Sequence, residues 1–99
     1  MNQRVLLDLN APTFQADFVR LEAEDLKQTA KTLRKLLGMT WDVVYRDTGL
    51  KWEEIRSSKG TYTLRISRKC RAIVVREGDF MRFLAIHADH NGAYENRGS

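Results

Sequence analysis

The sequence contains few of the residues that constrain small or irregular chains. Among its 99 residues there are one cysteine, Cys70, one proline and six glycines. A lone thiol cannot form an intramolecular disulfide or a four-thiolate zinc site, so we expect Cys70 to be an ordinary small residue of a strand. Because proline and glycine are scarce and 42% of the residues are apolar, the composition is that of a globular domain with its own core.

Long apolar runs are also missing. The longest uncharged ones, residues 5–7 and 72–75, are far shorter than the roughly 20 residues that span a membrane. Asp8 interrupts the N-terminal apolar stretch and leaves no signal-peptide core. We therefore expect a cytoplasmic protein. Since the sequence shows no repeat, linker or low-complexity tract, we expect a single domain over residues 1–99.

Acidic residues are scarce in one part of the chain. The whole sequence has 17 basic and 13 acidic residues, net +4. From Arg56 to Arg82 there are eight basic and two acidic residues, net +6, whereas the rest has nine and eleven, net −2. This excess is typical of a phosphate-binding surface, because neutralised phosphates release counterions. It equally fits a solvated sheet edge, where lysine and arginine discourage strand pairing.

Apolar residues of the first half recur with strand spacing and then with helix spacing. Alternation over residues 5–10 predicts a strand, and residues 10–13 combine a breaker with a helix start. Two sets at helical spacing predict two helices: Phe14, Phe18 and Leu21, then Leu26, Ala30, Leu33 and Leu37. Asp25 is a candidate cap between them and Gly38 a candidate C-cap. One long helix is the alternative, because residues 22–25 contain no breaker.

The second half changes to the two-residue period of strands. Thr40 and Gly49 bound a short third helix. The next predicted strand has two faces, with Tyr62, Leu64 and Ile66 on one and Thr63, Arg65 and Ser67 on the other. Residues 71–76 and 80–87 form a hairpin around Gly78. We expect an α+β fold, with the N-terminal strand and helices packed on one face of a twisted, mainly antiparallel sheet, and the other face left for solvent or a ligand.

A basic cluster follows the outward face of this predicted strand. Arg65, Arg68, Lys69 and Arg71 lie within seven residues that include no acid. Four such side chains can converge on one phosphate or on a developing oxyanion. A solvated turn with the same composition is the alternative.

The only two histidines, His87 and His90, stand at the end of the last predicted strand, close to Tyr94. An imidazole can accept and donate a proton near neutral pH, so these residues are candidates for acid–base catalysis. Histidines without a role are the alternative. Two histidines and Asp89 without fixed spacing are a weak zinc signal, and we expect neither a metal nor a cofactor.

Three aromatic side chains fall in or near the predicted third helix. Trp41, Tyr45 and Trp52 suit a core or an interface with another protein. Stacking on nucleic-acid bases is the alternative.

The amino-acid sequence of the second half resembles that of the RelE/ParE superfamily of bacterial toxins from type II toxin–antitoxin systems. The resemblance covers roughly residues 50–95 and rests on four segments: Tyr62-Thr63-Leu64-Arg65-Ile66, Arg71-Ala72-Ile73-Val74, Glu77-Gly78-Asp79, and Leu84-Ala85-Ile86-His87 continuing to Tyr94. Residues 41–55 look like an insertion of extra helix that many members lack. The resemblance implies the α+β fold expected above.

The resemblance also implies an activity. RelE-like members cut messenger RNA in the ribosomal A site, whereas ParE-like members poison DNA gyrase. In the RNA-cutting branch, arginines on the central strands hold phosphate, and side chains near the last strand move protons. The matching positions are Arg65 and Arg71 for phosphate, Lys69 as a neighbouring basic residue, and His87, His90 and Tyr94 for the protons. With Lys69, we expect Arg56, Lys59 and Arg68 of the basic stretch to contact RNA. No carboxylate is evident as a base, so a histidine would take that role.

The implied reaction is attack of a 2′-hydroxyl on the adjacent phosphorus, which gives a 2′,3′-cyclic phosphate and a free 5′-hydroxyl without a metal ion. The implied partners are the ribosome with its messenger RNA, and a cognate antitoxin that covers the basic surface and exposed aromatic side chains. The two histidines favour RNA cleavage over gyrase poisoning, which needs no proton transfer. A non-catalytic RNA-binding domain is the remaining alternative.

Overall fold

The computed structural model describes residues 3–88, which form three helices and five strands. In chain order these are β1 (Leu6–Asp8), α1 (Pro12–Arg20), α2 (Ala23–Leu37), α3 (Trp41–Arg46), β2 (Glu53–Glu54), β3 (Thr61–Arg65), β4 (Cys70–Glu77) and β5 (Phe80–Ala88). Two expected site residues, His90 and Tyr94, lie outside the described residues. No helix within residues 3–88 is long and apolar enough to cross a membrane.

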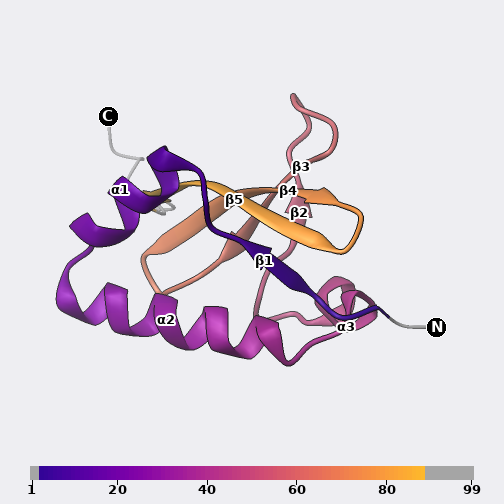
Figure 1. The fold of residues 1–99 in the computed structure, drawn as a ribbon, viewed down its shortest axis with the longest axis horizontal. Helices are drawn as coiled ribbons and strands as arrows, with labels where there is room; N and C mark the ends of the chain where they lie inside the picture. Colours follow the sequence, from indigo (N-terminus) through magenta and orange to yellow (C-terminus); the bar gives the residue numbers. More distant parts are fainter. Residues whose placement is uncertain (1–2, 89–99) are drawn as a thin grey trace.

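The strands form one sheet in the order β1-β5-β4-β3-β2. β1 runs parallel to β5, and the other neighbours are antiparallel. Figure 1 shows α1 and α2 against one side of the sheet, while the loop between β2 and β3 projects away from α2. The expected α+β fold, with helices on one face of a mainly antiparallel sheet, is confirmed.

The first two helices are separate, so the alternative of one long helix is wrong. α1 begins at Pro12, whose fixed φ suits a first helical position, and the backbone is extended at Leu21 and Glu22. Glu22 occupies the N-cap of α2, so Asp25 is not a cap. Asp25 is buried in the first turn, where its Oδ1 accepts a hydrogen bond from Ser67 at 3.1 Å. The sequence could not reveal this contact between distant residues.

Ser67 does not lie on the open face of the sheet, as its alternation with Arg65 led us to expect. β3 ends at Arg65, and Ser67 is buried in the following turn. Three side-chain hydrogen bonds tie this turn to α2: Ser67 to Asp25, Thr32 Oγ1 to the Ile66 carbonyl at 2.9 Å, and the Arg68 amide to Gln28 Oε1 at 3.1 Å. The period-two pattern therefore stops one residue earlier than we expected.

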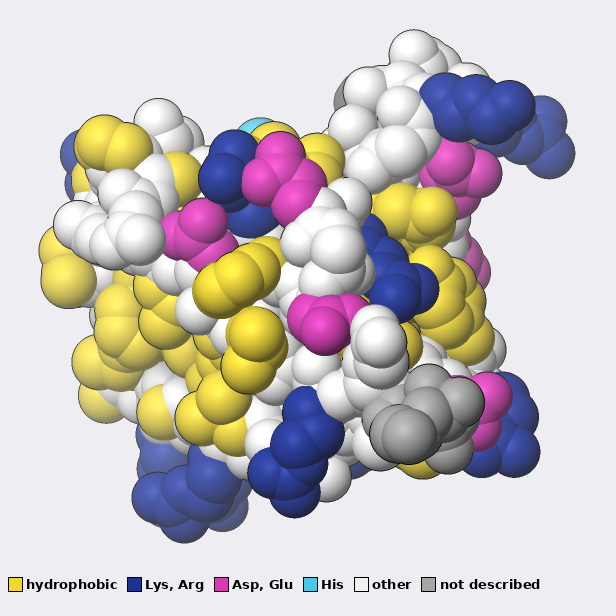
Figure 2. All heavy atoms as spheres, turned by 45° about the vertical axis from the view of Figure 1, so that its right-hand side comes forward, with side chains coloured by type: hydrophobic (Ala, Val, Ile, Leu, Met, Phe, Trp, Pro, Cys, Tyr) yellow, Lys and Arg dark blue, Asp and Glu magenta, His cyan; other side chains and the backbone are white. Residues whose placement is uncertain are grey.

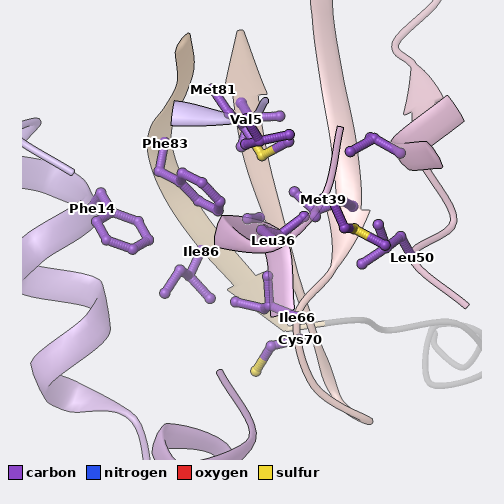
Figure 3. Close-up of a cluster of buried hydrophobic side chains, with 14 of the residues drawn as sticks. Val5, Phe14, Leu36, Met39, Leu50, Ile66, Cys70, Met81, Phe83 and Ile86 are labelled. Atoms are coloured by element: carbon purple, nitrogen blue, oxygen red, sulfur yellow. The ribbon is translucent and has the colours of Figure 1, made fainter. Parts of the chain in front are cut away.

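A β-bulge in β5 changes which side chains enter the core. Met81 and Phe83 are fully buried, and so is most of Ile86, which lies three residues further on (Figure 3). The register explains this, because Val74 pairs with Phe83 and Ile73 with Ala85, which leaves Leu84 as an extra residue. Without the bulge, strict alternation would direct His87 toward the core with Phe83. With it, His87 is exposed on the open face.

The segment from α3 to β2 carries an aromatic cluster under one end of the sheet. Trp52 stacks on Tyr62 with ring centroids 4.5 Å apart, and meets Trp41 and Tyr45 edge to face. Trp41 is only 3% exposed, whereas Tyr45 is 49% exposed. The three aromatics are therefore mainly a core that fixes α3 to the sheet, which is one of the two roles expected for them, and Tyr45 also keeps an exposed surface.

Arg76 closes this cluster, and its loss should weaken the fold. Its guanidinium lies 4.1 Å from the Trp41 ring centroid and donates to the Gly78 carbonyl at 2.8 Å and to Tyr45 Oη at 3.2 Å. A cation–π contact contributes about 0.5–1 kcal/mol at an exposed site. We expect Arg76→Ala to lower the free energy of unfolding by about 1–2 kcal/mol in urea titrations. Arg56→Ala in the exposed β2–β3 loop is the control, and an equal loss there would contradict the role of Arg76.

Candidate active site

Three expected site residues lie side by side across the open face of the sheet. Arg65 on β3 is paired with Arg71 on β4, and Arg71 with His87 on β5. Directly opposite residues share a face, with Cβ atoms about 4.5–5.5 Å apart. The structure therefore gathers three of the five expected catalytic residues into one row, which we call the Arg–His row.

Arg71 is held in place by the outer edge of the sheet. Its Nη2 donates to the Lys51 carbonyl at 3.0 Å and to Thr63 Oγ1 at 3.1 Å, and lies 3.6 Å from Glu53 Oε1. The Arg71 side chain is 22% exposed. These contacts fix the direction of the guanidinium, while its position on the open face leaves it within reach of a bound phosphate.

The contacts of Arg71 reveal a carboxylate that the sequence analysis missed. Glu53 pairs with Thr63, which places its side chain on the open face one row away from Arg65, and the side chain is 68% exposed. A carboxylate therefore does stand beside the two arginines, and a histidine is not the only candidate for the base. Glu53 was hard to recognise from the sequence as a strand residue, because β2 is only two residues long and both are glutamates.

Arg65 stands at the outer end of the Arg–His row. Its backbone amide donates to the Leu50 carbonyl at 2.7 Å, and its Nε is buried with no hydrogen-bond partner among the described residues. A buried donor without a partner carries a desolvation cost. The same side chain lines a cavity of about 740 Å³ between α2 and the turn after β3.

The four residues expected to contact RNA fall into two separate groups. Arg68 and Lys69 are exposed in the turn after β3, next to Arg65 and Arg71. Arg56 and Lys59 are exposed in the loop before β3, which Figure 2 shows as the projecting corner at the upper right with Lys and Arg side chains at its tip. A five-residue strand separates the groups by about 17 Å. They do not form a single cluster.

Two arginines of the basic stretch serve the fold instead of an open site. Arg76 packs on the aromatic cluster, and Arg82 pairs with Asp8 at 3.1 Å and with Glu77 at 2.8 Å. The backbone amide of Asn10 and the Arg82 guanidinium both hold the pKa of Asp8 below its ordinary value. The excess charge of +6 therefore overstates the cations that face a ligand.

Metal-ligating side chains do not cluster within residues 3–88, where no group of three histidine, cysteine, aspartate or glutamate residues could hold an ion. Cys70 is buried on β4. The open face instead combines two guanidiniums, one carboxylate and one imidazole. Such a set can bind a phosphodiester, remove a proton on one side and supply a proton on the other.

Comparisons with known proteins identify the fold. No known family profile and no curated protein sequence match this chain. Solved structures do, among them a conserved hypothetical protein from Helicobacter pylori with 18% identity and a TM-score of 0.61, covering 89% of this chain and 94% of that one. The RelBE2 toxin–antitoxin complex from Mycobacterium tuberculosis matches with 15% identity and a TM-score of 0.57, covering 89% and 99%.

The DinJ–YafQ complex from E. coli matches over a similar span. Its identity is 15% and its TM-score 0.55, covering 92% of this chain and 99% of that one. The matched chains are thus almost entirely covered, and the likeness extends beyond the second half of the sequence that suggested it. The described part of this chain has the fold of the RelE-like toxins.

Proposed function

We propose that the protein is the toxin of a type II toxin–antitoxin pair and that it cuts messenger RNA on the ribosome without a metal ion. The observation that carries this proposal is the Arg–His row together with Glu53. An RNA-cutting site needs groups that hold phosphate and a pair that transfers protons, and the open face presents both.

The proposed reaction assigns one role to each side chain. The carboxylate of Glu53 removes the proton of the 2′-hydroxyl, whose oxygen forms a bond to phosphorus. Arg71 and Arg65 stabilise the negative charge of the phosphorane. The imidazolium of His87 donates a proton to the departing 5′-oxygen as the phosphorus–oxygen bond breaks. The products are a 2′,3′-cyclic phosphate and a free 5′-hydroxyl.

The register supports base and acid roles at opposite ends of the site. Glu53 and His87 stand on strands three spacings apart and two residues out of register, about 16 Å apart at the backbone. Both side chains extend from the open face, and each needs a hydrogen bond of about 2.6–3.2 Å to its own oxygen. A phosphodiester placed over Arg71 fits between them. His90 and Tyr94 are proposed to orient or protonate the substrate from the C-terminal segment.

The ribosome is proposed to position the substrate. Neither the cavity beside α2 nor the one beside α1 is lined by Arg71 or His87, so we assign the alignment of the 2′-hydroxyl with phosphorus to the ribosome. Correct alignment contributes a large share of the barrier reduction in reactions of this kind. We therefore expect slow cleavage of free RNA and faster cleavage of messages in the A site.

A cognate antitoxin is the proposed protein partner. Two of the structurally similar chains come from the RelBE2 and DinJ–YafQ complexes. In this chain the exposed cations of the two RNA-contact groups offer an acidic or helical segment a complementary surface. Co-expression with the adjacent small open reading frame should restore growth, and the two products should co-purify.

A translation extract tests the activity. Purified protein added to ribosomes programmed with a defined message should produce new RNA 5′ ends at A-site codons, detected by primer extension. The same message without ribosomes is the control and should be cut much more slowly. Intact messages together with loss of gyrase supercoiling would instead establish a gyrase poison, and intact messages with tight RNA binding would establish a non-catalytic RNA-binding domain.

A further inference from the structure

A basic groove adjoins the Arg–His row at the end of β3. It is the cavity of about 740 Å³ already noted beside Arg65, and it lies between α2 and the turn that follows β3. Four cationic side chains line it: Lys31, Lys35, Arg65 and Arg68. None of its lining residues is acidic. We call it the α2 groove.

The walls of the α2 groove are fixed by hydrogen bonds. Gln28, Lys31, Thr32 and Lys35 follow one another at helical spacing along one stripe of α2. Thr32 bonds the Ile66 carbonyl and Gln28 the Arg68 amide, so the turn cannot move independently of the helix. The backbone positions that carry its cations are therefore set before any ligand arrives.

Within residues 3–88, only one of the four cations of the α2 groove has an acidic partner. Lys35 pairs with Asp47 at 3.2 Å. The side chains of Lys31 and Arg68 are exposed, and the buried Nε of Arg65 finds no acceptor among the described residues. A polyanion is the ligand that such a surface favours. Figure 2 shows Lys and Arg side chains gathered along the lower edge of the molecule, where α2 lies.

The structure assigns the α2 groove to the sugar-phosphate backbone of the RNA strand that is cut, at nucleotides beyond the scissile bond. This assignment rests on the proposed function. Arg65 belongs to both surfaces, since it is paired with Arg71 in the sheet and also lines the groove. A strand that crosses the Arg–His row from His87 to Arg65 leaves the sheet directly into the groove.

An RNA strand fits the α2 groove better than an acidic segment of a protein partner. Arg65 belongs to both the Arg–His row and the groove lining, so one strand of repeating phosphates can contact both surfaces. Its lining combines cations with amide and hydroxyl side chains, which suits phosphate and ribose oxygens. Such contacts bind RNA without reading its sequence.

The salt dependence of RNA binding tests this assignment. The probe is a single-stranded RNA of about ten nucleotides, within the range that nucleic-acid grooves cover, with a 2′-deoxy sugar at the cut position so that no cleavage is required. The test variant is Lys31→Gln with Arg68→Gln. The matched control is Lys27→Gln with Arg34→Gln, which removes the same charge from exposed positions of α2 outside the groove.

Removing two phosphate contacts has a defined effect on single-strand binding. The slope of log K against log salt should become shallower by about 1.4, and affinity at 0.1 M salt should fall about 25-fold. The control variant should keep the slope of the unmodified protein. A trinucleotide centred on the cut position should bind both variants equally, because it is too short to enter the groove.

Each result has one meaning. Equal slopes in the test and control variants overturn the assignment, and so does an equal loss of affinity for the trinucleotide. Loss of antitoxin co-purification without a change in RNA binding would also overturn it, in favour of a protein partner. If ribosomal cleavage is absent but the salt slope of RNA binding changes as expected, the assignment of the α2 groove to RNA is retained and the proposed function is wrong. If cleavage persists with unchanged slopes, the groove alone fails.

Discussion

Replacing Glu53 by Gln should slow RNA cleavage on the ribosome by about 10²–10⁴-fold, the usual contribution of a general base. Glutamine keeps the size of the side chain and an oxygen that can accept from Arg71, which lies 3.6 Å from Glu53 Oε1. It cannot take a proton from the 2′-hydroxyl. His87→Ala should cause a loss of similar size, because the departing 5′-oxygen then has no proton donor.

Single-turnover cleavage of a pre-bound message measures both variants. Glu54→Gln is the matched control for Glu53, since it changes the next residue of β2, which pairs with Tyr62 and points to the opposite face. Its acceptor oxygen for the Gly60 amide is retained. We expect cleavage by this control to stay near the unmodified rate. A Glu53→Gln variant that cleaves as fast as Glu54→Gln would remove the carboxylate from the reaction.

Much of the fold could be predicted because the local signals agreed with one another. Helical spacing in the first half and alternation in the second half indicated the elements, and the hairpin was set by Gly78, whose φ is 62°. The pairing of Arg71 with Arg65 follows from counting residues outward from the short turn that joins β3 to β4. The row of Arg65 and Arg71 was therefore within reach of the sequence alone.

The rest of the site depends on features with weak local signals. The bulge at Leu84 reverses the faces of β5, and nothing in the run from Phe80 to Ala88 marks it as irregular, yet it decides that His87 joins Arg71. Glu53 belongs to a two-residue strand whose pairing with β3 is set by a loop of six residues. The α2 groove joins residues more than 30 positions apart, which no periodicity relates.

Arg71→Ala should lower the single-turnover cleavage rate by about 10²–10³-fold, as loss of one preorganised donor to a developing oxyanion usually does. Arg71→Lys should recover only part of the rate. An ammonium is a single point of charge, whereas the guanidinium donates to Thr63, to the Lys51 carbonyl and to a phosphate from fixed directions. Arg76→Lys is the control, because Arg76 lies under the aromatic cluster and not on the open face.

The role of Arg71 is identified by whether Arg71→Ala lowers the affinity for RNA or the cleavage rate at saturating RNA. If Arg71 only holds the RNA, saturating RNA should restore the rate of Arg71→Ala, and the affinity alone should fall. If it stabilises the phosphorane, the rate at saturation should stay low, because that charge exists only in the transition state.

A double variant tests whether Arg71 and Glu53 act together. The cation beside Glu53 is lost in Arg71→Ala, so the double variant with Glu53→Gln should lose less than the product of the two single effects. Fully multiplicative losses would show that the two side chains act independently.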